Sequence, residues 1–358
     1  MTPLAGILGA RIAATGPITI ADYMAECLMH PRHGYYSTRD PFGQAGDFTT
    51  APEISQMFGE LIGLFLAQCW LDQGRPAPFI LAEIGPGRGT LMADALRAMK
   101  SVPGLTDAAR VHLVEMSPTL RARQAETLGA AVIAWHDRIH DLPEGPLYLV
   151  ANEFFDALPI RQFLRSGRGW RERHVTLTDD QLAPAFGPET LYGDLADRME
   201  DTAEGEMVET CPALPSIATE IARRIAAHGG VALTIDYGGW RSHGDTLQAL
   251  RAHRFEDPFA APGEADLTAH VDFEPLAAAF RGAGCGVSAM TPQGTFLNRL
   301  GIAARAGALA RNLDGDALQS HLAAHRRLTD AEEMGQLFKV LACYPAGNAT
   351  PPGLDPMR

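Results

Sequence analysis

Apolar segments and helical segments alternate through residues 79–154 of this chain, and this alternation restricts the fold more than any other feature of the sequence. Near-continuous apolar runs such as F-I-L-A-E-I and L-Y-L-V-A-N are typical of strands that are buried on both faces. The stretches between them carry apolar residues at helical spacing. We therefore predict an α/β fold, with a parallel sheet covered by helices.

The segments around this alternation predict the remaining parts of the fold. Residues 1–76 are mainly helical in pattern and form an N-terminal helical segment. The sheet core is expected over 77–165 and again over 214–304. Between them, residues 166–213 contain shorter and more polar runs, which are typical of an antiparallel insertion. Residues 305–358 are predicted to form a C-terminal helical cap.

The composition excludes several classes of protein. A formal net charge of −13 argues against a nucleic-acid partner, because neutralising phosphates needs a basic face. The five cysteines are scattered without a C-x-x-C pair, so we expect no metal site and a reducing compartment.

The sequence also indicates where the protein works. The most apolar run, at 61–71, is too short to cross a bilayer, so no membrane insertion is expected. The first residues show no targeting pattern, which favours a bacterial cytoplasm over a mitochondrial matrix. The oligomeric state stays open.

The turn A-E-I-G-P-G-R-G-T follows the first predicted strand and places Gly85, Gly87 and Gly89 two residues apart. A dinucleotide fingerprint needs its third glycine at the position that Thr90 occupies. Glu83 would repel a pyrophosphate, but it suits an ammonium group, and the next helix N-terminus suits a carboxylate. Both charges occur in the amino-acid moiety of S-adenosylmethionine. The turn therefore favours a methyl donor over a nicotinamide.

Polar residues also end the other strands of the predicted sheet. Glu115 could accept hydrogen bonds from ribose hydroxyls, or it could interact with the dipole of the next helix. Trp135 and His136 could flank an adenine, although Trp135 could equally belong to the core. Asn152 ends the fourth strand. Since the carboxyl ends of parallel strands meet at one edge of a sheet, we expect one site there.

The segment N-E-F-F-D-A-L-P carries two carboxylates, Glu153 and Asp156, directly after a buried strand. A buried carboxylate pair needs a cationic partner or a shared proton to offset its desolvation. We interpret this segment as the wall where a methyl acceptor meets the donor. The alternative is a strand end at which Asp156 caps the next turn.

Together these motifs resemble those of the MidA-like class I methyltransferases, whose mitochondrial members are the arginine methyltransferase assembly factors of respiratory complex I. The resemblance covers nearly the whole chain. It implies a Rossmann-like class I methyltransferase sheet and S-adenosyl-L-methionine as the cofactor. The motifs that carry it are H-G-Y-Y, G-D-F-T-T-A-P-E-I-S-Q-M-F-G-E, E-I-G-P-G-R-G-T, N-E-F-F-D-A-L-P, I-D-Y-G and G-E-A-D-L-T-A-H-V-D-F.

The resemblance also implies residue roles. The donor site would be lined by Glu83, Gly85, Gly87, Gly89, Glu115 and Asn152. The N-terminal segment would close over it through Thr50, Pro52 and Gln56. The acceptor side would be shaped by Asp236, Tyr237, Asp266, Thr268 and His270.

The implied function is arginine N-methylation of a protein substrate, expected to be a complex I subunit. A guanidinium has a pKa above about 12 and arrives protonated, so carboxylates must hold it. Glu153 and Asp156 are the candidates for this clamp, with Asp236 as a third. His270 is a candidate proton acceptor, or else a satisfied structural residue.

Three other functions stay possible at this point. A small-molecule O- or N-methyltransferase would share every donor motif. A non-catalytic assembly factor could bind the donor for stability alone. A nicotinamide oxidoreductase is disfavoured by Glu83 and Thr90.

Overall fold

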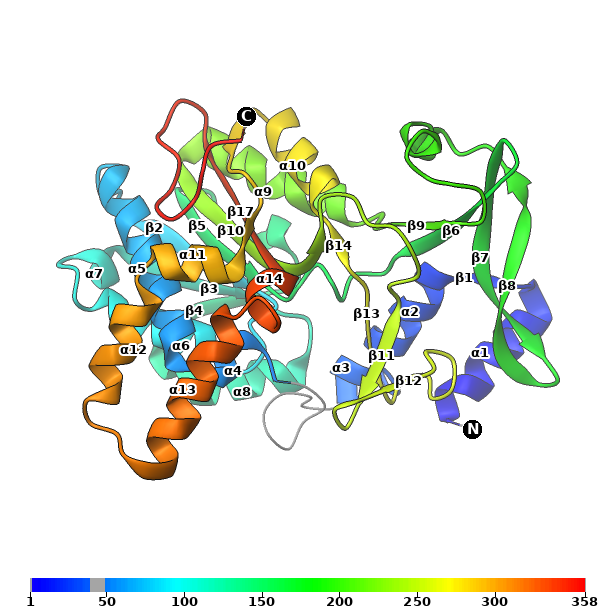
Figure 1. Ribbon diagram of the computed structural model, residues 1–358, viewed down its shortest axis with the longest axis horizontal. Coiled ribbons are helices and arrows are strands. Elements are labelled where there is room, and N and C mark those ends of the chain that lie inside the picture. The colour runs from blue at the N-terminus through cyan, green and yellow to red at the C-terminus, as the bar shows by residue number, and fades with distance from the viewer. Residues whose placement is uncertain (1, 39–48, 358) are drawn as a thin grey trace. The chain divides into compact units, whose positions relative to one another are not determined.

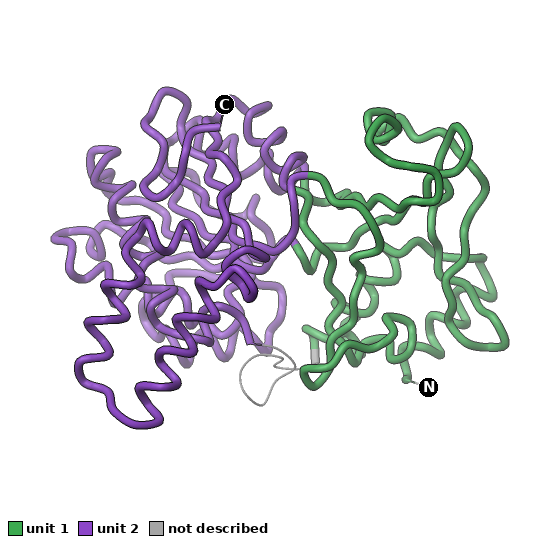
Figure 2. Tube along the Cα trace, in the orientation of Figure 1, with its two compact units in different colours: residues 1–48, 156–214, 241–272 green, residues 49–155, 215–240, 273–358 purple. Residues whose placement is uncertain are grey.

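The computed structural model describes residues 2–38 and 49–357 (Figure 1). The chain divides into two compact units, coloured separately in Figure 2, and each unit is assembled from three stretches of sequence. The first unit contains residues 1–48, 156–214 and 241–272. The second unit contains residues 49–155, 215–240 and 273–358.

The second unit is built on a sheet with the strand order β15-β17-β10-β5-β2-β3-β4. Pairing is parallel from β10 through β4, which confirms the predicted parallel sheet, and antiparallel on both sides of β17. The strands are β2 (Phe79–Ile84), β3 (Ala109–Val114), β4 (Val132–His136), β5 (Leu147–Asn152), β10 (Gly230–Gly239), β15 (Cys285–Val287), β16 (Thr291–Pro292) and β17 (Phe338–Pro345).

Helices cover both faces of this sheet (Figure 1). The connections β2–β3–β4 and β5–β10 run in opposite directions along the sheet, so right-handed crossovers place their helices on opposite faces. The helices of the unit up to β10 are α4 (Ala51–Ile54), α5 (Gln56–Asp72), α6 (Thr90–Met99), α7 (Leu105–Ala108), α8 (Pro118–Leu128), η1 (Gly129–Ala131), η2 (Ile139–Asp141) and α9 (Leu214–His228).

Helix α8 shows how the sequence sets an element boundary. The Ser117 hydroxyl accepts a hydrogen bond from the Leu120 N–H, and Pro118 occupies the first turn. The helix ends at Gly129, which has a φ of +54°. Ser117 and Pro118 thus mark the start of this helix in the sequence, and Gly129 marks its end.

The C-terminal part of the second unit contains the expected helices and also an unexpected strand. Its helices are α10 (Phe273–Gly282), α11 (Gln293–Arg299), α12 (Ile302–Ala310), α13 (Gly315–Thr329) and α14 (Met334–Leu337). The chain then forms β17, which lies inside the sheet between β10 and β15. The run F-K-V-L-A-C-Y is mostly buried because both faces of the sheet are covered, whereas it was predicted to belong to the C-terminal helical cap.

The first unit is mainly antiparallel. Its larger sheet has the order β1-β7-β6-β9 with β8 paired to β7, as expected for the insertion, and its strands begin at Arg161. A smaller sheet has the order β12-β11-β13. The elements are α1 (Pro3–Thr15), β1 (Ile18–Thr19), α2 (Ile20–Met29), α3 (Tyr35–Thr38), β6 (Arg161–Ser166), β7 (Gly169–Thr178), β8 (Gln181–Thr190), η3 (Gly193–Leu195), η4 (Asp197–Met199), β9 (Met207–Thr210), β11 (Gln248–Arg251), β12 (Arg254–Glu256), β13 (Asp266–Thr268) and β14 (Val271–Asp272).

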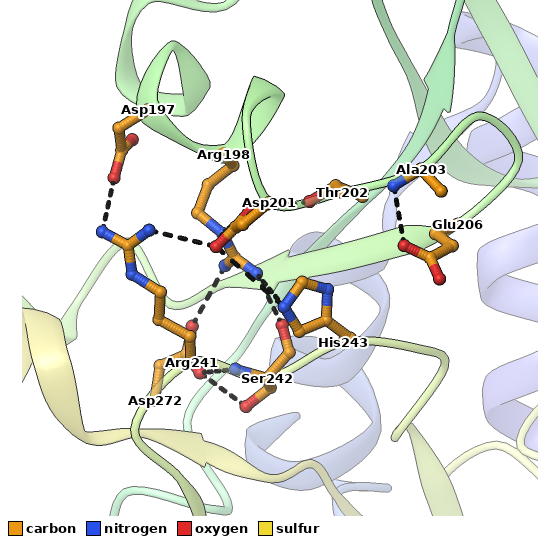
Figure 3. Close-up of polar contacts among 10 residues, drawn as sticks. All are labelled: Asp197, Arg198, Asp201, Thr202, Ala203, Glu206, Arg241, Ser242, His243 and Asp272. Atoms are coloured by element: carbon orange, nitrogen blue, oxygen red, sulfur yellow. Dashed lines mark hydrogen bonds and ion pairs between the residues drawn. The ribbon is translucent and has the colours of Figure 1, made fainter.

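A buried arginine holds part of the first unit together (Figure 3). Arg198 donates to the Ser242 carbonyl oxygen at 2.8 Å, pairs with Asp201 at 3.1 Å and lies 3.7 Å from the Asp272 carboxylate. Arg241 also binds Asp201, at 3.0 Å. This cluster fixes η4 against both ends of the 241–272 stretch.

Among the helices of the described residues, none combines the length and the apolar character that crossing a membrane requires.

Candidate functional site

The centre of the parallel sheet has the topology of a ligand site. From β2 the chain proceeds to β3 and β4 on one side, and from β5 it proceeds to β10 on the other. Open α/β sheets bind ligands at the carboxyl ends of strands where this reversal occurs. Glu83 lies near the carboxyl end of β2 and Asn152 ends β5, its neighbour in the sheet.

The glycine turn between β2 and α6 has the conformation that only glycine adopts without strain. Gly85, Gly87 and Gly89 have φ angles of +63°, +53° and +80°. Gly89 is also the N-cap residue of α6, and it offers no side chain to the N–H groups of the first turn. The N–H groups of Gly85 and Gly89 donate to the carbonyl oxygens of Val114 and Pro86, so the N–H groups at the start of α6 are the ones that suit a bound carboxylate.

Two buried acceptors beside this turn lack a hydrogen bond. Within the described residues, neither Glu83 Oε2 nor Asn152 Oδ1 has a partner. Burial raises the pKa of Glu83 to about 8, and a hydrogen bond from the Met92 N–H opposes this rise. Unsatisfied buried acceptors are costly, so a ligand that donates hydrogen bonds explains them. An ammonium group fits these two acceptors.

Gln124 links three residues that the sequence predicts for the same ligand. Its Nε2 donates to the Gly87 carbonyl oxygen at 2.8 Å and to Glu115 Oε2 at 3.2 Å. Its Oε1 accepts a hydrogen bond from Trp135 Nε1 at 2.8 Å. Gln124 lies outside the motifs from which the site was predicted. A signal was present, because Leu120, Gln124 and Leu128 are spaced by four residues along the buried side of α8.

Glu115 has a structural partner as well as the predicted ribose role. Its Oε1 accepts a hydrogen bond from the Ser117 N–H at 2.8 Å, at the start of α8. Since each carboxylate oxygen can accept about two hydrogen bonds, this contact is compatible with ribose binding. The ribose role stays a prediction.

His136 is paired with a second histidine. Its Nε2 lies 2.9 Å from His112 Nδ1 on the neighbouring strand. Burial lowers the pKa of His112 to about 4, and it also lowers the pKa of His136. Both rings are therefore neutral near pH 7, with one ring N–H donating to the other nitrogen.

The residues predicted to close over the donor site lie at the starts of α4 and α5. Thr50 is the N-cap residue of α4, Pro52 is buried in its first turn, and Gln56 begins α5 with an exposed side chain. Residues 46–48 of the same motif lie outside the described residues. Helix α4 is tied to the rest of the site because Thr90 Oγ1 donates to Glu53 Oε1 at 2.5 Å.

Glu153 has a left-handed backbone conformation, with a φ of +51°. Its N–H donates to the Ile235 carbonyl oxygen at 2.9 Å. Its Oε1 accepts hydrogen bonds from the Ala51 N–H and from Asn152 Nδ2, both at 3.1 Å. A non-glycine residue in this conformation is strained, and such residues cluster at functional sites.

Asp236 holds the backbone that follows Glu153. Its side chain is fully buried. Oδ2 accepts hydrogen bonds from the N–H groups of Phe154 and Phe155 at 3.2 and 2.9 Å, and Oδ1 accepts one from the Tyr237 N–H at 3.0 Å. These contacts make Asp236 a positioning group for the loop. Its predicted contact with an acceptor stays a prediction.

The remaining acceptor-side candidates belong to the first unit. The Tyr36 hydroxyl, from the H-G-Y-Y motif, donates to Asp266 Oδ1 at 2.8 Å. Burial raises the pKa of Tyr36, and the carboxylates of Asp266 and Asp156 raise it further. The structure therefore brings Tyr36, Asp156 and Asp266 close together.

Thr268 and His270 follow in the same part of the first unit. Gln248 Nε2 donates to Thr268 Oγ1 at 3.2 Å, and the His270 N–H donates to Thr246 Oγ1 at 2.9 Å. His270 is half-buried. Its role as a proton acceptor stays a prediction.

Comparison with known proteins agrees with this site. A family model described as "Putative S-adenosyl-L-methionine-dependent methyltransferase" matches residues 61–291. The protein arginine methyltransferase NDUFAF7 of Mus musculus, a mitochondrial protein, is 37% identical over 96% of this chain and 85% of the relative. The Homo sapiens protein of the same name is 36% identical over 96% and 84%.

Solved structures resemble the whole chain. One is the crystal structure of a likely methyl transferase from Burkholderia thailandensis, bound to S-adenosyl-homocysteine. It has a TM-score of 0.84 and 32% sequence identity, and the match covers 98% of this chain and 93% of that chain. A native crystal structure from the same organism has a TM-score of 0.81 and 33% identity, with the same coverage. The predicted class I methyltransferase fold is confirmed.

The curated relatives overturn one expectation. A bacterial cytoplasm was expected over a mitochondrial matrix, but the relatives from Mus musculus, Homo sapiens and Drosophila melanogaster are all named as mitochondrial proteins. The expectation was wrong because a missing targeting pattern in the first residues does not identify a compartment.

The sheet reversal, the glycine turn and the two unpaired acceptors fit a methyl donor, and the family match covers both strands that carry them. The relatives and the solved structures extend the match to nearly the whole chain. The chain therefore belongs to the MidA-like family of S-adenosyl-L-methionine-dependent class I methyltransferases.

Proposed function

We propose that this chain transfers a methyl group from S-adenosyl-L-methionine to an arginine side chain of a protein, and that this protein is a subunit of respiratory complex I. The names of the relatives support the arginine acceptor, since they are protein arginine methyltransferases. The observation that carries the proposal is the conformation of Glu153, a strained carboxylate residue directly after the donor-side strand β5.

The donor would be held at the carboxyl ends of the central strands. Glu83 and Asn152 would accept hydrogen bonds from its ammonium group, and the N–H groups at the start of α6 would bind its carboxylate. Glu115 would accept from the ribose hydroxyls, and Trp135 and His136 would flank the adenine. When bound, the cofactor supplies an activated methyl group on a sulfonium.

Glu153 would hold the acceptor guanidinium. Hydrogen bonds from Ala51 and Asn152 fix its Oε1, so the carboxylate has a defined orientation. A carboxylate forms paired hydrogen bonds with a guanidinium and stabilises its positive charge. Because an activated donor needs little further chemistry, holding the attacking nitrogen in line is the main task of the protein.

Asp236 supports Glu153 by accepting hydrogen bonds from the N–H groups of Phe154 and Phe155, the two residues that follow it. The first-unit residues Asp156, Asp266 and His270 stay candidates for the acceptor side.

The test compares the wild-type protein with Glu153→Gln. Each is incubated with isotopically labelled S-adenosylmethionine and isolated complex I subunits, and labelled arginines are identified by mass spectrometry. Glu153→Gln should keep its affinity for S-adenosyl-homocysteine and lose arginine labelling, whereas Glu332→Gln, at an exposed position, should keep both.

Other outcomes separate the competing functions. Labelling of small molecules alone would favour a small-molecule methyltransferase. Tight binding of S-adenosyl-homocysteine with no transfer by the wild-type protein would favour a non-catalytic assembly factor. Undiminished labelling by Glu153→Gln would remove Glu153 from the mechanism.

A further inference from the structure

We propose that Gln124 is a positioning residue of the donor site. Its side-chain amide holds three groups in place: the glycine turn at Gly87, the Glu115 carboxylate proposed to bind ribose, and Trp135 beside the proposed adenine position. The inference rests on the donor site as assigned above. Gln124 lies on α8, outside every motif that the sequence identifies, and its side chain has no exposed surface.

The hydrogen-bonding capacity of the amide is matched to its surroundings. A glutamine side chain has two N–H donors and one carbonyl acceptor. The donors bind the Gly87 carbonyl oxygen and Glu115 Oε2, and the acceptor binds Trp135 Nε1. The reversed amide would place its oxygen against two acceptors. The partners therefore allow one orientation.

The contact with Glu115 prepares that carboxylate for a diol. Ser117 occupies one acceptor position on Oε1, and Gln124 occupies one on Oε2. The Met116 N–H also hydrogen-bonds to Glu115, and an ionised carboxylate has about four acceptor positions. These bonds therefore orient the carboxylate and leave it acceptor capacity for a ribose hydroxyl. Burial raises the pKa of Glu115, and the bonds from Ser117 and Gln124 oppose this rise and favour the ionised form.

The contact with Gly87 fixes the turn that faces the amino-acid moiety. Helix α8 packs directly on this turn, since a Cβ atom built on Gly89 would lie 3.1 Å from Leu128 and 3.7 Å from the Cα atom of Gln124. The Gly87 carbonyl oxygen is held from the same helix, at 2.8 Å. The groups proposed to bind the amino-acid moiety and the ribose of the donor are thus both held by the side chain of Gln124.

No other side chain of this length can replace these contacts. Methionine would leave the Gly87 carbonyl oxygen, Glu115 Oε2 and Trp135 Nε1 without this partner. Glutamate would keep an acceptor for Trp135, but it would place a second carboxylate against Glu115. Either change should loosen the donor site while the sheet beneath it stays folded.

The experiment measures S-adenosyl-homocysteine affinity by calorimetry, together with methyl-transfer kinetics, for the wild-type protein and Gln124→Met. We expect the Kd and the KM for the donor to rise roughly ten- to a hundredfold, since hydrogen bonds between buried groups are lost. With the site intact at saturation, kcat should stay within about threefold. A residue that is only structural would not produce this split.

The matched control is Gln293→Met. Gln293 is also a buried glutamine of the second unit, and its Nε2 donates to the Leu328 carbonyl oxygen at 3.0 Å, away from the donor site. Gln293→Met removes this hydrogen bond together with an Oε1 atom that has no partner among the described residues, so it should change the thermal midpoint less than Gln124→Met and leave the S-adenosyl-homocysteine Kd unchanged.

A second pair of ligands tests the orientation of Glu115. Wild-type protein should bind adenosine more tightly than 2′-deoxyadenosine, and Gln124→Met should reduce this preference. If Gln124→Met does not fold, Gln124→Glu, which keeps the size and the Trp135 acceptor, should show the same loss of S-adenosyl-homocysteine affinity.

Two results would overturn the inference in distinguishable ways. Unchanged S-adenosyl-homocysteine affinity in a folded Gln124 variant would reject the role of Gln124 alone. A wild-type protein that does not bind S-adenosyl-homocysteine would reject the donor-site assignment and this inference with it.

Discussion

At the scale of single residues, the donor site contains an ionisable group whose state must change on binding. Glu83 is buried with a pKa of about 8, so in the ligand-free protein it is mostly protonated at pH 7. An ammonium ligand favours its ionised form. Binding should therefore release a proton, and affinity should increase as the pH rises towards about 8.

Calorimetry of S-adenosyl-homocysteine at pH 7, in buffers of different ionisation enthalpy, measures this release. Wild-type protein should release close to one proton per ligand, and Glu83→Gln should release none from this position. A buffer-independent binding enthalpy in the wild-type protein would contradict the prediction.

The raised pKa of Glu83 also predicts how the stability of the folded protein depends on pH. The folded-state pKa of Glu83 is raised above its ordinary value of 4.5, so the folded state binds more protons than the unfolded state between pH 4.5 and about 8. Ionisation of Glu83 thus destabilises the ligand-free protein as the pH rises through this range. Glu83→Gln should have a higher thermal midpoint than wild-type at pH 8, and a difference that vanishes near pH 4 would confirm the sign.

Asp236 offers a second prediction at this scale. Asp236→Asn keeps one acceptor but replaces the other with an amide donor that faces backbone N–H groups. We expect a loss of about 1–3 kcal/mol in the free energy of unfolding, measured by urea denaturation. Because Glu153 loses support, kcat should fall more than the affinity for S-adenosyl-homocysteine. Equal losses in both would indicate a general collapse of the site.

How much of the site the sequence predicts depends on how local the signal is. Glu83 and the three glycines lie within seven residues of one another, and their pattern is complete in one turn. Gln124 binds Gly87 and Trp135, which are 37 and 11 residues away in the chain. The spacing along α8 indicates that Gln124 is buried, but it does not indicate which distant residues Gln124 binds. Sequence reasoning therefore finds the residues that touch the donor more readily than the residues that hold them.

At the scale of elements, the position of α6 depends on two glycines in α5. A Cβ atom on Gly63 would lie 2.6 Å from the Ala95 carbonyl oxygen, and one on Gly59 would lie 2.6 Å from the Asp94 Cβ atom. These distances are shorter than van der Waals contact, so the two helices pack closely because both positions lack a side chain. Since α6 begins at the glycine turn, this packing also places the turn.

Gly63→Ala should therefore destabilise the protein by about 1–3 kcal/mol and weaken S-adenosyl-homocysteine binding. The matched control is Gly307→Ala in α12, where an added Cβ atom would meet nothing within 4 Å. That change should be neutral or stabilising, because alanine favours a helix. Thermal denaturation and calorimetry of both variants check the prediction, and equal effects at the two positions would contradict it.

The strand β17 shows where element prediction stops. Its run V-L-A-C-Y is as apolar as the strands that were predicted, but it directly follows helical segments. Its partner β10 pairs Ala232 with Cys343, more than a hundred residues apart. Tertiary pairing of this kind decides between a strand and a helix for a short apolar run, and periodicity alone does not.

At the scale of the whole molecule, the chain passes between the two units several times, so neither unit is a continuous domain. Helices α1–α3 of the N-terminal helical segment belong to the first unit, whereas α4 and α5 belong to the second. Hydrophobic periodicity reports which residues are buried, but not which core buries them. The functional division proposed from the sequence, with a boundary at residue 76, therefore stays a prediction.

The proposed donor contacts all lie in the second unit, which leads to a prediction about ligand-induced protection. A ligand at about 100 times its Kd stabilises the state that binds it by about 2.7 kcal/mol. Hydrogen exchange measured by mass spectrometry, with and without S-adenosyl-homocysteine, should show slower exchange in β2, β5, α6 and α8. Strands β7 and β8 of the first unit should exchange at unchanged rates. Equal protection of β7 and β8 would mean that the two units open as one cooperative structure, and the donor would then stabilise the acceptor-side residues as well as its own site.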